Sequence, residues 1–173
     1  MKIARFFLLF ACLVPVAAEA KQDKPNIVWI VSEDNSAKWL RIYGPGGAPM
    51  PTVERLAKNG LIFNHAFSCA PVCSVARSTI ISGCYAPRTG AQYHRKQATV
   101  PMPDGLKMFP FYLRENGYHT TNNSKEDYNL MKEGEVWHES GRKGHWRNRP
   151  EGSPFFAIFN FTISHESKIR KRP

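Results

Sequence analysis

The sequence predicts an α/β fold in which helices flank a mostly parallel sheet. Residues 24–32 and 155–163 form apolar runs rich in β-branched and aromatic side chains, which is typical of strands buried on both faces. Segments with helix start and stop signals separate these runs along the chain. Strands and helices therefore alternate, as they do where parallel strands are joined by helical crossovers.

The first strand runs directly into two acidic residues. Residues 24–32 read Lys-Pro-Asn-Ile-Val-Trp-Ile-Val-Ser, and Glu33 and Asp34 follow. The continuous apolar stretch predicts a strand inside a parallel sheet. Open α/β sheets bind ligands at the carboxyl ends of their strands. Glu33 and Asp34 are therefore the first candidates for a functional site.

The other elements follow from turn residues and apolar spacing. In chain order we expect a helix over 52–59, a short strand over 61–63, helices over 78–82 and 106–116, and strands over 118–122 and 155–163. The first helix is expected to start at Thr52, to stop at Gly60 and to turn Leu56 inward. Residues 44–51 and 132–154 are rich in glycine, proline or polar side chains and are expected to be loops.

The first twenty residues have the features of an export signal. A basic start is followed by an apolar run over 6–18 and by Ala-Glu-Ala, a small-x-small cleavage pattern. The run is too short for a membrane-spanning helix of about 20 residues, so we expect no stable membrane insertion. We predict a signal peptide over 1–20 and a periplasmic or extracellular protein, with a lipid anchor on Cys12 as the alternative.

The chain is strongly basic. Its formal net charge is +10, and the signal peptide removes two cations and one acid, which leaves +9. Such a surface favours anionic partners. An exported protein meets sulfated or carboxylated glycans more readily than nucleic acid, so we expect a glycan partner and no nucleic acid. The alternative is that the excess charge only aids solubility.

An odd number of cysteines remains after the signal peptide. Cys69, Cys73 and Cys84 are left in a chain whose export favours disulfide pairing. At least one of them must be free, paired with another chain or chemically altered. A buried thiol pair or a disulfide between Cys69 and Cys73 is one alternative.

The most specific pattern is the run from Cys73, which reads Cys-Ser-Val-Ala-Arg-Ser-Thr-Ile-Ile-Ser-Gly-Cys-Tyr-Ala-Pro-Arg-Thr-Gly. It resembles the two-part signature of type I, formylglycine-dependent sulfatases, in which Arg77 lies four residues after the cysteine. The second part is filled at Gly83, Tyr85, Arg88 and Gly90. Val75 departs from the pattern, because the family usually has proline or alanine there. The resemblance extends over residues 24–165.

This resemblance implies an alkaline-phosphatase-like α/β fold, with residues 21–173 as the N-terminal part of the catalytic domain. It also implies that a maturation enzyme converts Cys73 into formylglycine. The hydrated aldehyde would attack sulfur with one hydroxyl and expel sulfate with the other. Arg77, one helical turn along the same face, would hold the formylglycine hydroxyl and the developing negative charge.

The resemblance further implies a bound metal ion. Glu33 and Asp34 occupy the place of the family's aspartate pair, and with the modified Cys73 they would hold Ca²⁺, or less readily Mg²⁺. The family takes two further ligands, an aspartate and an asparagine or similar residue, from a later segment. The sequence shows no such segment, so we expect that the C-terminal portion of the domain and part of the metal site are missing.

Weaker matches suggest two more catalytic residues. The stretch Gly-Tyr-His-Thr, followed by Ser-Lys, indicates Lys125 as a point charge near the formylglycine or sulfate. The last apolar strand leads to His165, where the family has a histidine that donates to the ester oxygen or protonates the leaving alcohol. Asp127 departs from the family, which commonly has histidine two residues after the lysine. His94 is the candidate replacement.

The expected function is hydrolysis of sulfate esters or sulfamates on an exported polysaccharide or glycosaminoglycan. A phosphohydrolase or phosphonate hydrolase of the same superfold is one alternative, because that fold supports both kinds of transfer. A third possibility is an inactive, truncated fragment or a basic glycan-binding protein, since part of the implied metal site is absent from the sequence.

Overall fold

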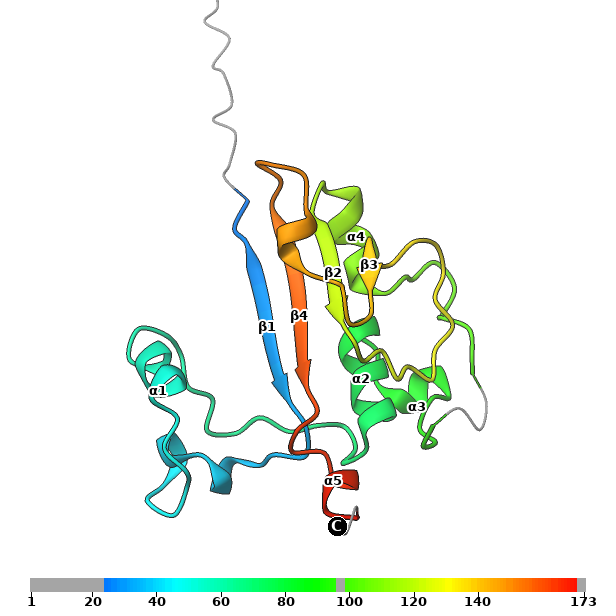
Figure 1. The fold of residues 1–173 in the computed structure, drawn as a ribbon. Coiled ribbons are helices and arrows are strands. Elements are labelled where there is room, and N and C mark those ends of the chain that lie inside the picture. The colour runs from blue at the N-terminus through cyan, green and yellow to red at the C-terminus, as the bar shows by residue number, and fades with distance from the viewer. Residues whose placement is uncertain (1–23, 96–98, 171–173) are drawn as a thin grey trace, which may run out of the picture.

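The computed structural model describes residues 24–95 and 99–170 of the chain (Figure 1). The signal peptide predicted over residues 1–20 lies outside these ranges. Among the described residues, no helix is both long and apolar enough to cross a membrane.

Four parallel strands form one sheet in the order β1-β4-β2-β3. The strands are β1 (Ile27–Ser32), β2 (His119–Asn123), β3 (Glu139–Ser140) and β4 (Phe155–Phe161). All pairings are parallel, so the carboxyl ends of the strands meet at one edge, the lower one in Figure 1. The predicted α/β fold with a mostly parallel sheet is confirmed. The short strand β3 was not predicted, because it interrupts a polar stretch that resembles a loop.

Helices of one to three turns cover the sheet only in part. Val28 and Ile30 of β1 are 48% and 68% exposed, so the expectation that this strand is buried on both faces is wrong. The helices are α1 (Pro51–Ala57), α2 (Cys73–Ser82), α3 (Ala86–Thr89), α4 (Phe109–Glu115) and α5 (Ser167–Arg170), with 3₁₀ helices at Ala37–Trp39, Arg41–Tyr43 and Trp146–Asn148. In Figure 1, α2 and α4 lie beside the sheet, whereas α1 stands apart from it.

Helix α2 starts five residues earlier than the sequence predicts. The residue before it, Val72, is extended and supplies no side-chain cap, so no start signal marks this end. Gly83 ends the helix in the left-handed conformation at a φ of 68°, which glycine adopts without strain. As a result, Cys73 occupies the first helical position and Arg77 follows one turn later.

Three expectations for residues 52–63 are wrong. Helix α1 begins at Pro51, whose fixed φ suits the first helical position, and Thr52 does not cap it. Leu56 is 60% exposed, because α1 stands apart from the sheet. Residues 61–63 form no strand, and Leu61 and Phe63 are exposed.

The core beside the sheet is built from aromatic rings. Phe156 of β4 is 1% exposed, and its ring centroid lies 5.3 Å from that of Trp29, 5.1 Å from Phe109 and 5.9 Å from Trp137. A second buried cluster contains Ile81 of α2 together with residues of the connecting loops. The two clusters hold α4 and α2 near the same face of the sheet.

We predict that Phe156→Ala lowers the free energy of unfolding by about 3–5 kcal/mol, because it removes the ring at the centre of this cluster. Phe161→Ala, on the same strand, is the matched control, since its side chain is 52% exposed and should change stability by less than about 1 kcal/mol. Urea denaturation followed by circular dichroism measures both values. A larger loss for the control would contradict this account of the core.

Candidate active site

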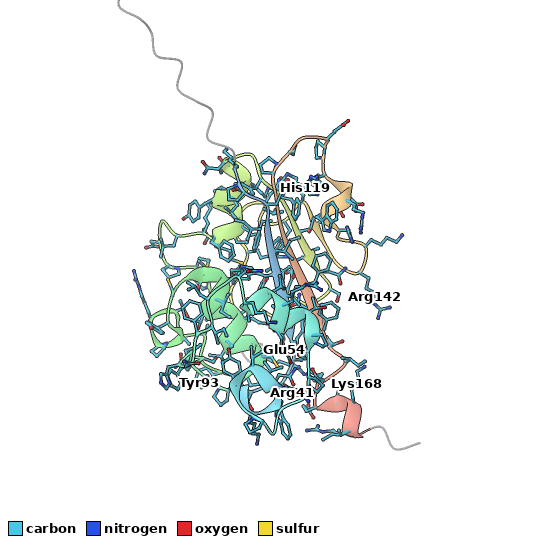
Figure 2. All side chains as sticks on the ribbon, turned by 90° about the vertical axis from the view of Figure 1, so that its left-hand side faces the viewer. Arg41, Glu54, Tyr93, His119, Arg142 and Lys168 are labelled. Atoms are coloured by element: carbon cyan, nitrogen blue, oxygen red, sulfur yellow. The ribbon has the colours of Figure 1, made fainter. Side chains whose placement is uncertain are left out.

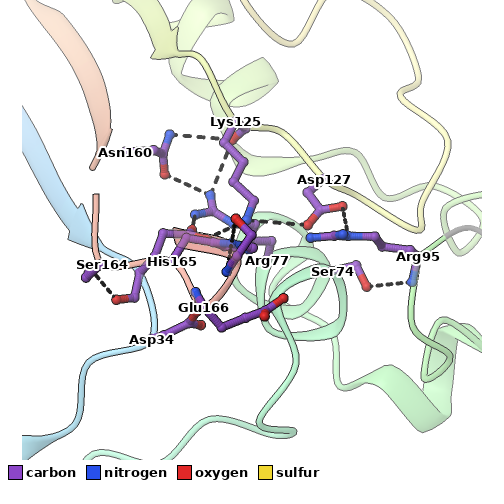
Figure 3. Close-up of polar contacts among 12 residues, drawn as sticks. Asp34, Ser74, Arg77, Arg95, Lys125, Asp127, Asn160, Ser164, His165 and Glu166 are labelled. Carbon is purple, nitrogen blue, oxygen red and sulfur yellow. Dashed lines mark hydrogen bonds and ion pairs between the residues drawn. The ribbon is translucent and has the colours of Figure 1, made fainter. Parts of the chain in front are cut away.

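Polar side chains from four separate segments meet at the carboxyl edge of the sheet (Figure 3). Glu33 follows β1, Arg77 lies on α2, Lys125 follows β2 and His165 follows β4. The sequence predicts each of these residues from a different motif. The structure brings them together around one carboxylate, that of Glu33.

The Glu33 carboxylate is the centre of this cluster. Its Oε1 accepts a hydrogen bond from Nη2 of Arg77, and its Oε2 accepts one from Nζ of Lys125 at 2.5 Å. Nε2 of His165 lies 3.8 Å from Oε2. Glu33 is only 4% exposed, so its charge is stabilised mainly by these partners.

Opposing effects act on the pKa of Glu33. Burial raises the pKa, because it disfavours the charged carboxylate. The hydrogen bonds from Lys125 and Arg77, together with their positive charges, lower it by more, so the net pKa lies below its ordinary value of 4.5. Glu33 is therefore ionised at neutral pH.

The other terminal nitrogen of the Arg77 guanidinium, Nη1, is also hydrogen-bonded. It donates to Oδ1 of Asn160 at 2.8 Å and to the Lys125 carbonyl at 3.3 Å. Asn160 in turn donates from Nδ2 to Oδ1 of Asn122 at 3.0 Å. Sequence reasoning did not assign Asn160 or Asn122 to the site. A buried asparagine within the apolar run of β4 was the available signal, because a buried amide requires partners.

Cys73 lies beside this network. Its Sγ, an oxygen of Glu33 and a ring nitrogen of His165 all lie within 4.8 Å of one another. Cys69, Cys73 and Cys84 are all free thiols, so the alternative of a Cys69–Cys73 disulfide is not what the structure has. Sγ of Cys69 instead lies 2.9 Å from Oγ1 of Thr79.

A cavity of about 380 Å³ opens next to Cys73. Cys73, Glu33 and Arg77 contribute its polar wall, and Trp29 and Ile81 belong to its apolar wall. A half-buried thiol, a guanidinium and a carboxylate therefore face a space between α2 and the sheet.

Asp34 is placed differently from Glu33. Its backbone has a φ of 51°, its side chain is exposed, and its Oδ2 accepts a hydrogen bond from the backbone N–H of Glu166 at 2.7 Å. Ser164 donates from Oγ to the carbonyl of Glu33 at 2.6 Å. These contacts attach the segment after β4 to the end of β1. Asp34 thus lies next to the Glu33, Cys73 and His165 cluster without being part of it.

Glu33 and Asp34 offer the type of ligand atom that a divalent cation binds, but they offer fewer ligand atoms than such an ion needs. Glu33 and Asp34 provide adjacent carboxylates, which are the hard oxygen donors that Ca²⁺ and Mg²⁺ prefer. Ca²⁺ takes about six to eight oxygen ligands, more than these two side chains and residue 73 supply. Both oxygens of Glu33 are also bonded to cationic side chains.

Asp127 extends the charged network away from Cys73. Its Oδ2 lies 3.7 Å from Nζ of Lys125, and its Oδ1 lies 3.6 Å from Nε of Arg95. His94, considered above as a replacement for the family's histidine, has its Nδ1 3.5 Å from Oγ of Ser74. His94 therefore lies near the residue after Cys73, and Asp127 is the side chain that faces Lys125.

This arrangement suits the binding of a tetrahedral oxyanion. Two half-buried cations, Arg77 and Lys125, converge on the Glu33 carboxylate beside Cys73, and an imidazole faces the same carboxylate. Guanidinium and ammonium groups in a partly buried site bind sulfate or phosphate oxygens strongly.

Comparisons with known sequences give a consistent result. The family model described as Sulfatase matches residues 25–167. An "Ulvan-active sulfatase" of Formosa agariphila is 37% identical over 157 residues, which cover 85% of this chain and 26% of the relative. The human N-acetylgalactosamine-6-sulfatase is 28% identical over 112 residues, covering 60% of this chain and 22% of the relative. The chain thus spans about a quarter of the length of these curated relatives.

Solved structures show the same fold. A 2-O GAG sulfatase superposes with a TM-score of 0.68 at 17% identity, over 83% of this chain and 36% of that one. A second structure, solved in complex with D-glucosamine-2-N,6-O-disulfate, gives a TM-score of 0.65 at 17% identity, over 83% and 35% of the two chains. The alkaline-phosphatase-like fold expected from the sequence is confirmed.

We predict that Glu33→Gln lowers the free energy of unfolding at pH 7 by about 2–4 kcal/mol, because it leaves the half-buried Arg77 and Lys125 without their carboxylate. The control is Glu135→Gln, which removes a carboxylate that is 83% exposed and paired with Arg114. It should cost less than about 1 kcal/mol. Urea denaturation in metal-free buffer measures both changes.

The Glu33→Gln deficit should also depend on pH. The folded-state pKa of Glu33 is lowered, so its stabilising effect is present above the ordinary value of 4.5 and is lost as pH falls through the folded-state value. The difference between parent and variant should therefore shrink below pH 4.5. A difference that grows on acidification would contradict the assigned direction.

Proposed function

Because the chain belongs to the sulfatase family, we propose that this protein hydrolyses sulfate esters of an anionic polysaccharide through a formylglycine made from Cys73. One observation carries the proposal. Arg77, Lys125 and His165 come from three different elements and converge beside the thiol of Cys73. That is the grouping needed to bind a sulfate group and to protonate a leaving alcohol.

The substrate class follows from charge and from the relatives. The chain is strongly basic, and its relatives include a protein named as ulvan-active and one named for N-acetylgalactosamine 6-sulfate. Sulfated carbohydrate is the substrate that fits both facts. We further propose that residues 1–20 export the protein to the periplasm or beyond the cell, where such polymers occur.

Arg77 and Lys125 supply the positive charge for the reaction. Each group is held by several partners, so it is preorganised before substrate arrives. Their ammonium and guanidinium hydrogens would bind the nonbridging sulfate oxygens and stabilise the charge that develops as the ester bond breaks. His165, with Nδ1 2.8 Å from Oγ of Ser167, directs Nε2 toward the site. Nε2 is the atom that would give a proton to the leaving alcohol.

Residue 73 and the acidic pair complete the proposed centre. A formylglycine at position 73, made by a maturation enzyme, would supply the hydroxyl nucleophile. Glu33 and Asp34 would hold Ca²⁺ with it, and the ion would lower the pKa of that hydroxyl and neutralise sulfate oxygens. The Glu33 carboxylate would also keep Arg77 and Lys125 in place beside residue 73.

Cys73 is the first residue to test. We predict that Cys73→Ala abolishes both formylglycine and sulfate release from a sulfated polysaccharide, with a rate loss of about 10⁴-fold or more, because the nucleophile is gone. Mass spectrometry of the tryptic peptide 59–77 detects the modification as the loss of one sulfur and two hydrogens with the gain of one oxygen. Ion chromatography of released sulfate measures the activity.

The matched control is Cys69→Ala, because Cys69 lies on the same tryptic peptide. This variant should keep both the mass change and the activity. A mass change that follows Cys69 instead would overturn the assignment of the nucleophile. Faster hydrolysis of phosphate esters than of sulfate esters by the parent would favour the phosphohydrolase alternative.

Calcium binding gives an independent prediction. Excess Ca²⁺ should raise the melting temperature of the parent, by an amount worth about 2.7 kcal/mol at 100 times the dissociation constant. Asp34→Asn should reduce the shift, because it removes a carboxylate ligand. Asp104→Asn, at an exposed aspartate, should leave it unchanged. An equal shift in all three proteins would place the calcium site elsewhere.

A further inference from the structure

A strongly basic segment follows β3. Residues 142–149 carry four formal positive charges and no acidic side chain, and the cations are Arg142, Lys143, Arg147 and Arg149. The first three are exposed. None of the four forms an ion pair with a carboxylate in the part of the chain that the structure describes. Arg149 is half-buried and donates hydrogen bonds to the carbonyls of Ser153 and Trp146. The charge of the three exposed cations is therefore the part available to an anionic partner.

The side-chain amides of Asn123 and Asn148 fix this segment to β2 and β3. Asn123 donates from Nδ2 to the carbonyls of Arg142 and Gly144, both at 3.2 Å. Asn148 donates from Nδ2 to the carbonyl of Lys143 at 3.2 Å and to the carboxylate of Glu139 at 2.6 Å. A partner that binds a prearranged loop loses less conformational entropy than one that must order it.

The ring of Trp146 forms cation–π contacts with two of the four cations. The Cζ atoms of Arg147 and Arg149 lie 4.5 and 5.1 Å from the ring centroid. The ring also stacks on Phe155, with centroids 5.2 Å apart and an angle of 17° between the planes. With the His145 ring, whose centroid lies 5.5 Å away, the Trp146 ring is thus already in contact with four side chains. Charge, rather than stacking on bases or sugars, is therefore the main attraction.

The basic segment borders the candidate active site. Asn123, which holds it, lies two residues before Lys125 on the same strand end. The backbone N–H of Gly141 donates at 2.9 Å to the carbonyl of Asn122, whose side chain accepts from Asn160 in the site. A polymer bound through one sulfate in the site would have neighbouring anionic groups within reach of this segment.

We propose that residues 142–149 form a binding surface for an anionic polysaccharide, which engages sulfate or carboxylate groups on sugar units next to the one in the site. The inference rests on the proposed function for the identity of the polymer. The binding itself depends on unpaired cations on a fixed loop and needs no catalysis.

The test uses Arg142→Ser/Lys143→Ser, because both side chains are exposed and neither forms a hydrogen bond or an ion pair among the described residues. The matched control is Arg41→Ser/Lys58→Ser, which removes the same charge from exposed side chains. Figure 2 shows Arg41 well separated from Arg142. Heparin, a densely sulfated polysaccharide, is the probe, and its affinity is measured by titration at several salt concentrations.

The first double variant should bind heparin at least about tenfold more weakly at 0.1 M salt, and its slope of log affinity against log salt should fall by about two. The control should stay within about twofold of the parent. Equal losses in both variants would show that only net charge matters and would overturn the proposal. Tighter binding of a DNA duplex or of anionic lipid vesicles than of heparin would overturn the choice of partner.

Measuring heparin binding and sulfate release in the same variants distinguishes a failure of the binding surface from a failure of the proposed enzymatic function. Cys73→Ala should keep full heparin affinity while it loses sulfate release. Arg142→Ser/Lys143→Ser should raise the KM for a sulfated polymer and leave the hydrolysis of a small sulfate ester unchanged. If the parent releases no sulfate but heparin binding still depends on Arg142 and Lys143, the surface stands and the enzymatic proposal fails.

Discussion

The buried carboxylate of Glu33 is the constraint on which the site depends. It is ionised and almost fully buried, so the fold must supply positive partners for it, and Arg77 and Lys125 are those partners. Because they come from α2 and from the turn after β2, the pairing fixes both elements against the end of β1. The same contacts place Cys73, at the start of α2, beside the cations. The ion pairs of Glu33 therefore both stabilise this end of the sheet and set the geometry of the site.

Unusual backbone conformations accompany this arrangement. Asp34, Ser124 and Asp127 adopt φ values of 51°, 77° and 51°, in a region that residues other than glycine seldom occupy. Each of them lies next to a strand end or next to Lys125. Such conformations persist only where surrounding contacts impose them, and they are common at functional sites. Here the surrounding contacts are the hydrogen bond from Glu166 to Asp34, the ion pair of Lys125 with Glu33, and the ion pairs of Asp127 with Lys125 and Arg95.

The sequence identifies the residues that meet at this site better than it predicts their arrangement. The apolar runs indicated β1 and β4, and the motifs led to Cys73, Arg77, Lys125 and His165 one at a time. Their convergence on Glu33 could not be read from spacing, because it depends on which strands are neighbours. The prediction of a strand over 61–63 was wrong, because local β propensity does not indicate whether a partner strand is present. The early start of α2 was missed because Val72 gives no capping signal.

Some cations of this chain are paired with a carboxylate and others are not. This difference would affect how each of them binds an anionic substrate. Arg77 and Lys125 are each bonded to Glu33, so a sulfate group must compete with a carboxylate for them. Arg142 and Lys143 have no such competitor among the described residues and can meet an anion at little desolvation cost. A polyanion would therefore gain its first attraction from the exposed cations and its strongest contacts only within the buried site. In the proposed function, long-range attraction and chemical recognition would thus belong to different residues, the first to Arg142 and Lys143 after β3 and the second to Arg77 on α2 and Lys125 after β2.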